Sequence, residues 1–442
     1  MLQTFRNAFV LPDLRKRILF TLGILVLYQL AAHVPVPGVN QDALNSLLQG
    51  QGAASALANI LNLLSGGAIS SFSVLAMGVY PYITAQIILQ LLAGVVPSLE
   101  RMLREEGTAG RQKLETYTFI LTIPMALLSA IGQIRIFSSS AQGEIIPGFG
   151  SQFLPTVAVL ATMTAGTFFA IWLGQLITEE GVGQGISIII FGGIVARIPS
   201  NIGQILSDQQ HALGGIIAFA IVVVLTVAVI VYVQEGERRV PVQYGKRVRG
   251  RRVFGGGATF IPIKVNMAGM IPLIFAQSLL VLPAILFQVL AGAFTDPSLS
   301  TFFTNLAAAF SGGRHELSWI YWLMMFLFVV GFTFFYTDVL MQQQNMAETL
   351  QKQGGFIPGI RPGGRTEEYI MAVSRRITLV GALFLGAIAV LPFFLTLFDI
   401  IPNAMNMSIL STGLLIVVGV VLDTIRQLEA QLTMRHYEGF LR

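Results

Sequence analysis

The sequence contains no cysteine, so disulfide bonds and thiolate metal sites are excluded. Only 11% of the 442 residues are charged and 54% are hydrophobic, whereas soluble domains carry roughly 25% charged residues. The four histidines, His33, His211, His315 and His436, are too scattered to form a metal-ligand cluster. This composition predicts an integral membrane protein that has no metal site or other cofactor.

The motifs of common enzyme classes are also missing. The sequence has no G-x-S-x-G, no H-E-x-x-H and no G-x-x-x-x-G-K-[ST]. No pair of carboxylates lies at membrane depth, and no predicted span carries a charge at its centre. Glycines alternate in 181–185, but this stretch lies between two apolar segments, so we expect a turn instead of a nucleotide-binding loop. The sequence therefore predicts no enzymatic activity.

Apolar segments of membrane-spanning length recur along the chain and predict an all-α integral membrane protein. The run that ends at Pro35 is longer than a typical signal-peptide core and lacks a small-residue cleavage site, so we expect it to be retained. We place ten transmembrane helices at about 18–34, 73–96, 114–134, 153–177, 186–205, 212–233, 267–291, 318–340, 370–395 and 408–428.

The distribution of positive charge predicts the orientation of these spans. Of the 27 lysines and arginines, all but Arg135, Arg197 and Arg314 fall on the side of the membrane where the N-terminus lies. Cytoplasmic loops carry the excess of basic residues in membrane proteins. We therefore expect both termini to be cytoplasmic.

Two cytoplasmic loops, 234–266 and 341–369, are too long to be simple connections. In the first, valines alternate with arginines, which predicts a two-stranded ribbon with a possible turn at 244–246. The glycines of the second predict a tight, ordered tip. The basic residues of these loops either fix orientation and contact anionic lipid, or form a docking surface for an acidic or RNA-containing partner.

The stretch 59–92 contains an unusual break. A short apolar helix ends at Ser65-Gly66-Gly67 and would rise only about 15 Å, which is half of the bilayer core. It is either a half-helix that re-enters the membrane or a capped amphipathic helix in an external loop. The following span carries Val79, Ile83, Gln86 and Gln90 on one face.

This face has two interpretations. It is either a packing stripe whose amides bond to neighbouring helices, or the wall of an aqueous funnel in which the aliphatic residues form a constriction. An uncharged aliphatic constriction has no preference among side chains and suits an extended polypeptide. The alternative function is a small-solute secondary transporter, which shares the span count and broken helices. The absence of charge at membrane depth disfavours that alternative.

Four long motifs then identify a family resemblance over nearly the whole chain. They are 63–67 with 78–83 (LLSGG and GVYPYI), 183–191 (GQGISIIIF), 264–269 (KVNMAG) and 356–363 (FIPGIRPG). The sequence resembles the SecY family, the channel subunits of the Sec protein translocase. Position 79 is valine where the family often has isoleucine, and Leu63 and Leu64 stand where bulkier side chains are common.

The resemblance implies two pseudo-symmetric five-helix halves, 1–205 and 206–442, around an hourglass pore within a single channel domain. The implied pore ring consists of Val79, Ile83, Ile186, Ile190, Ile274 and Ile416. The implied plug, about 55–71, contains Ile60, Leu61, Asn62, Leu63, Leu64, Ser65, Gly66 and Gly67. Spans two and seven resemble a lateral gate, and we assign Gln86, Gln90, Asn266, Gln277 and Ser278 to the gate and funnel.

The resemblance also implies the function and the partners. It implies a channel in the inner (plasma) membrane that conducts unfolded, signal-bearing polypeptide and releases apolar segments into lipid. The implied partners are small membrane subunits of the SecE and SecG type and the SecA motor ATPase or the ribosome, and no DNA is expected. The implied docking residues are Arg238, Arg239, Lys246, Arg247, Arg251, Arg252 and Arg361.

Overall fold

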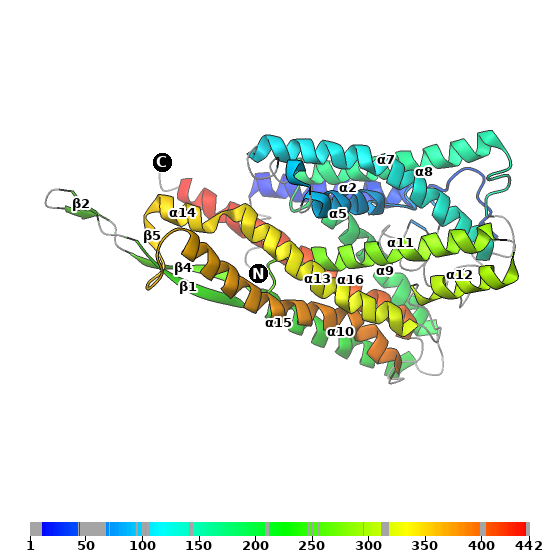
Figure 1. Ribbon diagram of the computed structural model, residues 1–442. Helices are drawn as coiled ribbons and strands as arrows, with labels where there is room; N and C mark the ends of the chain where they lie inside the picture. The colour runs from blue at the N-terminus through cyan, green and yellow to red at the C-terminus, as the bar shows by residue number, and fades with distance from the viewer. Residues whose placement is uncertain are drawn as a thin grey trace.

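The computed structural model is a bundle of long helices with a β-ribbon projecting from one end (Figure 1). It describes residues 11–42, 44, 68–69, 71–93, 96–99, 102, 107–140, 145–207, 212–244, 247–249, 252–254, 257–294, 296–310, 318–397 and 404–438. The residues of the predicted plug from Ile60 to Gly67 lie outside the described residues, as do Lys246 and Arg251. The fold is therefore mostly helical, as the sequence predicts.

Each of the ten predicted spans overlaps one helix. These helices are α2 (Pro12–Ala31), α5 (Tyr80–Ala93), α7 (Gly107–Ser140), α8 (Phe153–Glu180), α9 (Gly185–Ser207), α10 (Ala212–Glu235), α11 (Ile271–Ala293), α13 (Ser318–Gln344), α15 (Gly364–Leu397) and α16 (Ala404–Glu438). Two further helices, α12 (Pro297–Ala309) and α14 (Met346–Gln353), were not predicted. Among the described residues, four segments, within α7, α8, α13–α14 and α15, are both long and apolar enough to cross a membrane. The count of ten spans stays a prediction.

The predicted start of the second span is wrong. The sequence pattern places it at residue 73, but residues 71–79 form turns and α5 begins at Tyr80. Phe72 and Gly78 both have positive φ, and Pro81 is tolerated only in the first turn of a helix because it lacks an N–H group. As described, α5 has 14 residues and rises about 21 Å, which is less than the bilayer core.

Most helices of the first half of the chain lie on one side of the bundle, and most helices of the second half lie on the other side (Figure 1). Helices α2, α5, α7 and α8 lie together, while α10, α13, α15 and α16 form the opposite side of the bundle (Figure 1). Helix α11 contacts both α5 and α7, and α9 contacts α16 and α10, so these two helices join the groups. The start of α2 and the end of α16 both lie at the end of the bundle that carries the ribbon (Figure 1).

The first long loop forms the predicted ribbon. Strand β1 (Glu237–Tyr244) pairs antiparallel with β4 (Ala258–Lys264), and β2 (Arg247–Arg249) pairs with β3 (Arg252–Phe254). The predicted turn at 244–246 is wrong, because Arg249 pairs with Arg252 and the chain therefore reverses between these two residues. The pairing of Val248 with Val253 continues the β-branched ladder beyond the expected turn and explains the longer ribbon.

The second long loop joins the same sheet. Strand β5 (Gly355–Phe356) pairs with β1, so the strand order is β4-β1-β5. The outward and inward alternation of β1 buries Val240 and Val242 against Ile263, Leu350 and Ile370. The two loops thus pack together, and we call the described residues of 237–264 and 346–363 the loop platform.

Close packing inside the bundle gives a first prediction. A Cβ atom on Gly166 of α8 would collide with the backbone carbonyl of Val74, whereas a Cβ atom on Gly331 of α13 would meet nothing within 4 Å. We expect Gly166→Ala to lower the free energy of unfolding by about 1–3 kcal/mol, because the colliding atom is backbone and cannot rotate away. Thermal unfolding of the detergent-solubilised protein measures this effect. Gly331→Ala is the control and should be neutral or slightly stabilising, and equal losses for both variants would refute the close approach.

Candidate functional site

The six predicted ring residues lie together. Val79, Ile83, Ile190, Ile274 and Ile416 are members of one buried hydrophobic cluster, and Ile186 packs against it. They come from the start of α5, from α9, from α11 and from α16, and the helix contacts among these segments are those of α5 with α11 and of α9 with α16. Each of the five members is at most 5% exposed. The structure therefore places residues more than 300 positions apart in the same hydrophobic core cluster, and their role as a ring stays a prediction.

The backbone explains how Val79 reaches the cluster although it precedes its helix. The Ile83 amide donates to the Val79 carbonyl at 3.1 Å, so Val79 already accepts a helical hydrogen bond. The predicted stripe from Val79 through Ile83 to Gln86 and Gln90 therefore keeps its helical spacing. Gln86 and Gln90 are half-buried, and the Gln90 side-chain oxygen has no hydrogen-bond partner within the described residues.

Helices α5 and α11 are held together by a buried polar contact. The Tyr80 hydroxyl donates to the Ser278 carbonyl oxygen at 3.2 Å, across 198 positions of sequence. Gln277 and Ser278 are buried, and their side-chain oxygens have no partner in the part of the chain that the structure describes. Burying a polar group without a hydrogen bond costs free energy. The contact between α5 and α11 therefore favours an arrangement in which these side chains gain hydrogen-bond partners.

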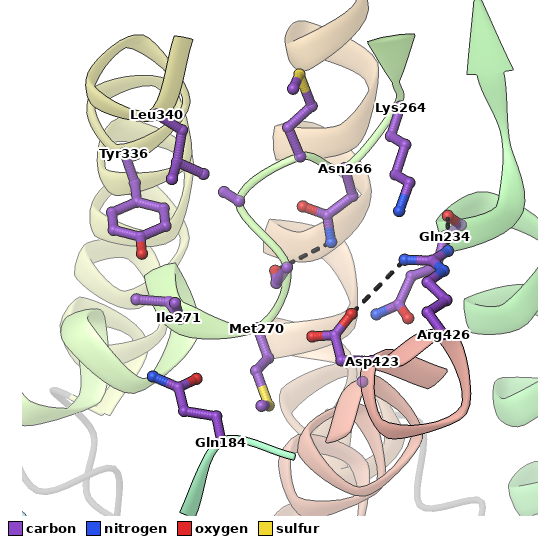
Figure 2. Close-up of a pocket in the computed structure, with 14 residues that line it drawn as sticks. Gln184, Gln234, Lys264, Asn266, Met270, Ile271, Tyr336, Leu340, Asp423 and Arg426 are labelled. Atoms are coloured by element: carbon purple, nitrogen blue, oxygen red, sulfur yellow. Dashed lines mark hydrogen bonds and ion pairs between the residues drawn. The ribbon is translucent and has the colours of Figure 1, made fainter. Parts of the chain in front are cut away.

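A polar pocket of about 170 Å³ lies between α10, α11, α13, α16 and the turn that precedes α9 (Figure 2). One wall is apolar and contains Met270, Ile271, Tyr336 and Leu340. The polar and charged residues that line the pocket are Gln184, Gln234, Lys264, Asn266, Asp423 and Arg426. The predicted gate and funnel residue Asn266 is thus part of a hydrophilic chamber.

Arg426 organises the charges of this pocket. Its guanidinium donates to the Gln234 carbonyl oxygen at 3.1 Å and to the Glu235 carboxylate at 3.0 Å, and it lies 3.6 Å from the Asp423 carboxylate. Burial lowers the pKa of Lys264 below its ordinary value, and the positive Arg426 lowers it further, while the nearby carboxylates oppose this shift. The ion pair between Arg426 and Glu235 ties α16 to the end of α10.

The predicted docking residues that the structure describes lie on the loop platform. Arg238 and Arg239 are exposed on β1, and Arg247 and Arg252 belong to β2 and β3. The Arg239 guanidinium lies over the Phe260 ring at 4.7 Å and pairs with Glu237 at 2.7 Å. Arg361 is exposed in the turn before α15, where its carbonyl oxygen accepts a bond from the Thr366 hydroxyl at 2.9 Å.

Two sequence expectations about turns are confirmed. Residues 181–184 connect α8 to α9 without helix or strand, and Gly183 has a positive φ, so this glycine-rich stretch is a turn. The loop around Arg361 is ordered, with positive φ at Gly359 and Gly363. Among groups of histidine, aspartate and glutamate in the described residues, no cluster has the arrangement of a metal site.

Sequence reasoning missed the pocket, the Tyr80–Ser278 contact and the strand pairing between the two loops. The only local signals are the polar Lys264 and Asn266 just before a span, and the acid-base pair Asp423 and Arg426 three residues apart in the last helix. These signals show which residues are polar at a span end. They do not show that the residues face one another.

Known proteins resemble this chain along its whole length. The SecY family model matches residues 73–425. The protein translocase subunit SecY of Streptomyces scabiei is 42% identical over 451 residues, covering 100% of both chains. A solved SecY structure, described as one whose plug domain stabilises the closed state of the translocation channel and maintains a membrane seal, shares 17% identity with a TM-score of 0.62, covering 94% of this chain and 92% of that one.

A second solved structure, Sec61 in the canine ribosome–channel complex from the endoplasmic reticulum, is 16% identical with a TM-score of 0.59 and covers 94% of this chain and 92% of that one. At such low identity these two structures support the fold alone. The SecY family model matches more than half of this chain, and the Streptomyces protein is 42% identical over the whole length of both chains. The chain therefore belongs to the SecY family.

Proposed function

We propose that the aliphatic cluster is the constriction of a polypeptide channel. The protein is a multi-pass membrane protein of the SecY family and a protein-conducting channel of the translocase. The observation that carries the proposal for this site is that Val79, Ile83, Ile190, Ile274 and Ile416 all belong to one buried hydrophobic cluster. An aliphatic collar excludes water and ions when it is empty, and it offers no fixed donors that would select one side chain over another.

The finer architecture of the channel is part of the same proposal. Ten spans in two halves, 1–205 and 206–442, surround the constriction, and the segment of about 55–71 is a plug. The arrangement of α2, α5, α7 and α8 against α10, α13, α15 and α16 supports two halves. The start of α2 and the end of α16 lie at the end of the bundle that carries the arginine-rich ribbon. Because cytoplasmic loops carry the excess of basic residues, this arrangement supports two cytoplasmic termini, and we place the protein in the inner membrane.

The seam between α5 and α11 is the proposed lateral gate. A signal segment of ten leucine-like residues gains about 3 to 6 kcal/mol on entering lipid. At about 1.4 kcal/mol per decade, this gain shifts a closed-to-open equilibrium by about two to four powers of ten. Opening of the gate by an apolar segment therefore requires no chemistry in this chain, and the gate releases such segments sideways.

The loop platform is the proposed docking surface for the cytoplasmic partner that drives translocation. Its exposed arginines on β1 and in the turn at Arg361 favour an acidic or RNA-containing surface, such as the SecA motor or the ribosome. The Sec61 channel described above was solved in a complex with the ribosome. Small membrane subunits of the SecE and SecG type complete the proposed assembly.

Site-specific crosslinking tests the proposed constriction. A photoreactive residue at Ile190 or at Ile274 should crosslink to a precursor arrested during translocation, because both residues belong to the proposed constriction. The matched control is Ile120, which is 59% exposed on α7 and should contact lipid. Crosslinks from Ile120 but not from Ile190 or Ile274 would place the polypeptide elsewhere and would overturn the proposal.

A further inference from the structure

The polar pocket contains two buried amides that have unused hydrogen-bonding capacity. Gln234 is 6% exposed and Asn266 is 5% exposed, so both are more than nine-tenths buried. The Gln234 side-chain nitrogen and the Asn266 side-chain oxygen have no partner within the described residues. The Asn266 nitrogen is already committed to the Gly269 carbonyl oxygen at 3.0 Å, which fixes the amide orientation. One donor and one acceptor therefore stay free beside the same cavity (Figure 2).

The charges of the pocket limit what it can bind. Lys264 and Arg426 line the pocket and are positive, Asp423 lines it and is negative, and Glu235, outside the lining, supplies a second negative charge that pairs with Arg426. Because these charges balance, the site favours neither a bare anion nor a bare cation. A neutral group that presents one hydrogen-bond acceptor and one donor matches the free amide atoms. The peptide group is the most common group of this kind.

The apolar wall of the pocket suits side chains of different shapes in a bound polypeptide. Met267, Met270 and Tyr336 contribute flexible or aromatic apolar surface. Methionine adapts its shape to many partners because its side chain is unbranched and polarizable. The pocket thus combines fixed hydrogen bonding to a backbone with tolerant packing against a side chain.

The pocket lies directly beside the proposed constriction on the cytoplasmic side. Ile271 and Gly419 line the pocket, and each is three residues from a ring residue, Ile274 and Ile416 respectively, or about 4.5 Å along its helix. Gln184 lies two residues before Ile186. Since α11 begins and α16 ends toward the ribbon, the pocket precedes the constriction for a chain that comes from the cytoplasm (Figure 1).

We propose that this pocket binds a peptide group of the translocating polypeptide just before the polypeptide passes the constriction. Gln234 donates to the peptide carbonyl oxygen, and Asn266 accepts from the peptide N–H group. This inference rests on the proposed function and adds a sequence-independent binding step to it. The recognised chemistry is the backbone itself, which every unfolded precursor carries.

The test uses the full channel complex in liposomes with two arrested precursors, one rich in glycine and serine and one rich in glutamate and lysine. Tyr336→p-azidophenylalanine keeps the ring that packs edge-on against Phe275 and places the probe in the pocket. We expect crosslinks to both precursors. Gln234→Met removes the donor with little change in shape and should lower crosslinking and translocation of both precursors by the same factor, about three- to tenfold. Gln112→Met, at an exposed position of α7 outside the proposed docking surface, should change neither.

A change in the precursor gives the same test without altering the channel. Amide-to-ester replacement in the arrested segment removes the N–H groups and should lower the Tyr336 crosslink by a similar factor. An unchanged yield, unequal losses for the two precursors, or crosslinks to the cytoplasmic motor instead would overturn the inference. A probe at Ile190 separates the two proposals, because a crosslink at Ile190 without one at Tyr336 refutes only the pocket.

Discussion

Replacing Ile274 with serine should allow precursors with a defective signal to cross the membrane at least about tenfold faster than through the unaltered channel. Burial of an isoleucine side chain contributes about 1.5–3 kcal/mol, so its loss from the cluster shifts the closed-to-open equilibrium by about one to two powers of ten. Ile274 is 5% exposed and lies in the cluster with Val79 and Ile416. The measurement compares signal-defective and intact precursors in membrane vesicles.

The control for this prediction must be an isoleucine that faces lipid. Ile120 of α7 is 59% exposed, and Ile120→Ser should leave the signal requirement unchanged. Ile83→Ser, at a second position of the cluster, should reproduce the effect of Ile274→Ser. If signal-defective precursors stay excluded by both cluster variants, these residues do not form the seal.

Reversing the charge of Arg361 should reduce precursor export about tenfold or more, while the channel itself still assembles in the membrane. Arg361 is exposed, and the ordered turn between Gly359 and Gly363 fixes its backbone. Loss of one member of a desolvated charge pair at an interface typically costs 2–5 kcal/mol. Export is measured with the complete translocase, and assembly is measured by the amount of folded channel in the membrane.

Lys352→Glu is the matched control for Arg361→Glu. Lys352 is exposed on α14 in the same loop, where it forms a surface ion pair with Glu348 at 2.7 Å. Such a surface pair contributes little, so the control should export normally. Equal losses in the two variants would show that the partner senses the total charge of the loop and not the Arg361 guanidinium.

Periodicity and charge predicted most of the helical framework. Each predicted span overlaps a helix because a membrane helix must be apolar along its whole length, and this requirement is visible without tertiary information. The start of α5 was mispredicted because hydropathy counts Val74 and Leu75 as span residues. The positive φ of Gly78 and the position of Pro81 determine the boundary instead.

The site residues also divide into those that the sequence predicts and those that it does not. The aliphatic stripe on α5 could be read from sequence spacing, and the other ring positions were inferred from the family resemblance. The pocket could not be predicted, because it depends on how the end of α10, the turn at Asn266 and residues 419–426 of α16 meet in space. Polar residues at a span end usually indicate only the membrane surface, and their convergence is a tertiary property.

The pairing of β5 with β1 also orders the events of biosynthesis. The first loop leaves the ribosome with the edge of β1 uncovered, and its partner strand follows only after α11, α12, α13 and α14 have been made. At 5–20 residues per second, that delay is on the order of ten seconds. A half-made chain therefore carries the arginine-rich ribbon but not the complete three-stranded sheet. The sheet becomes complete only when the two last helices, α15 and α16, remain to be synthesised.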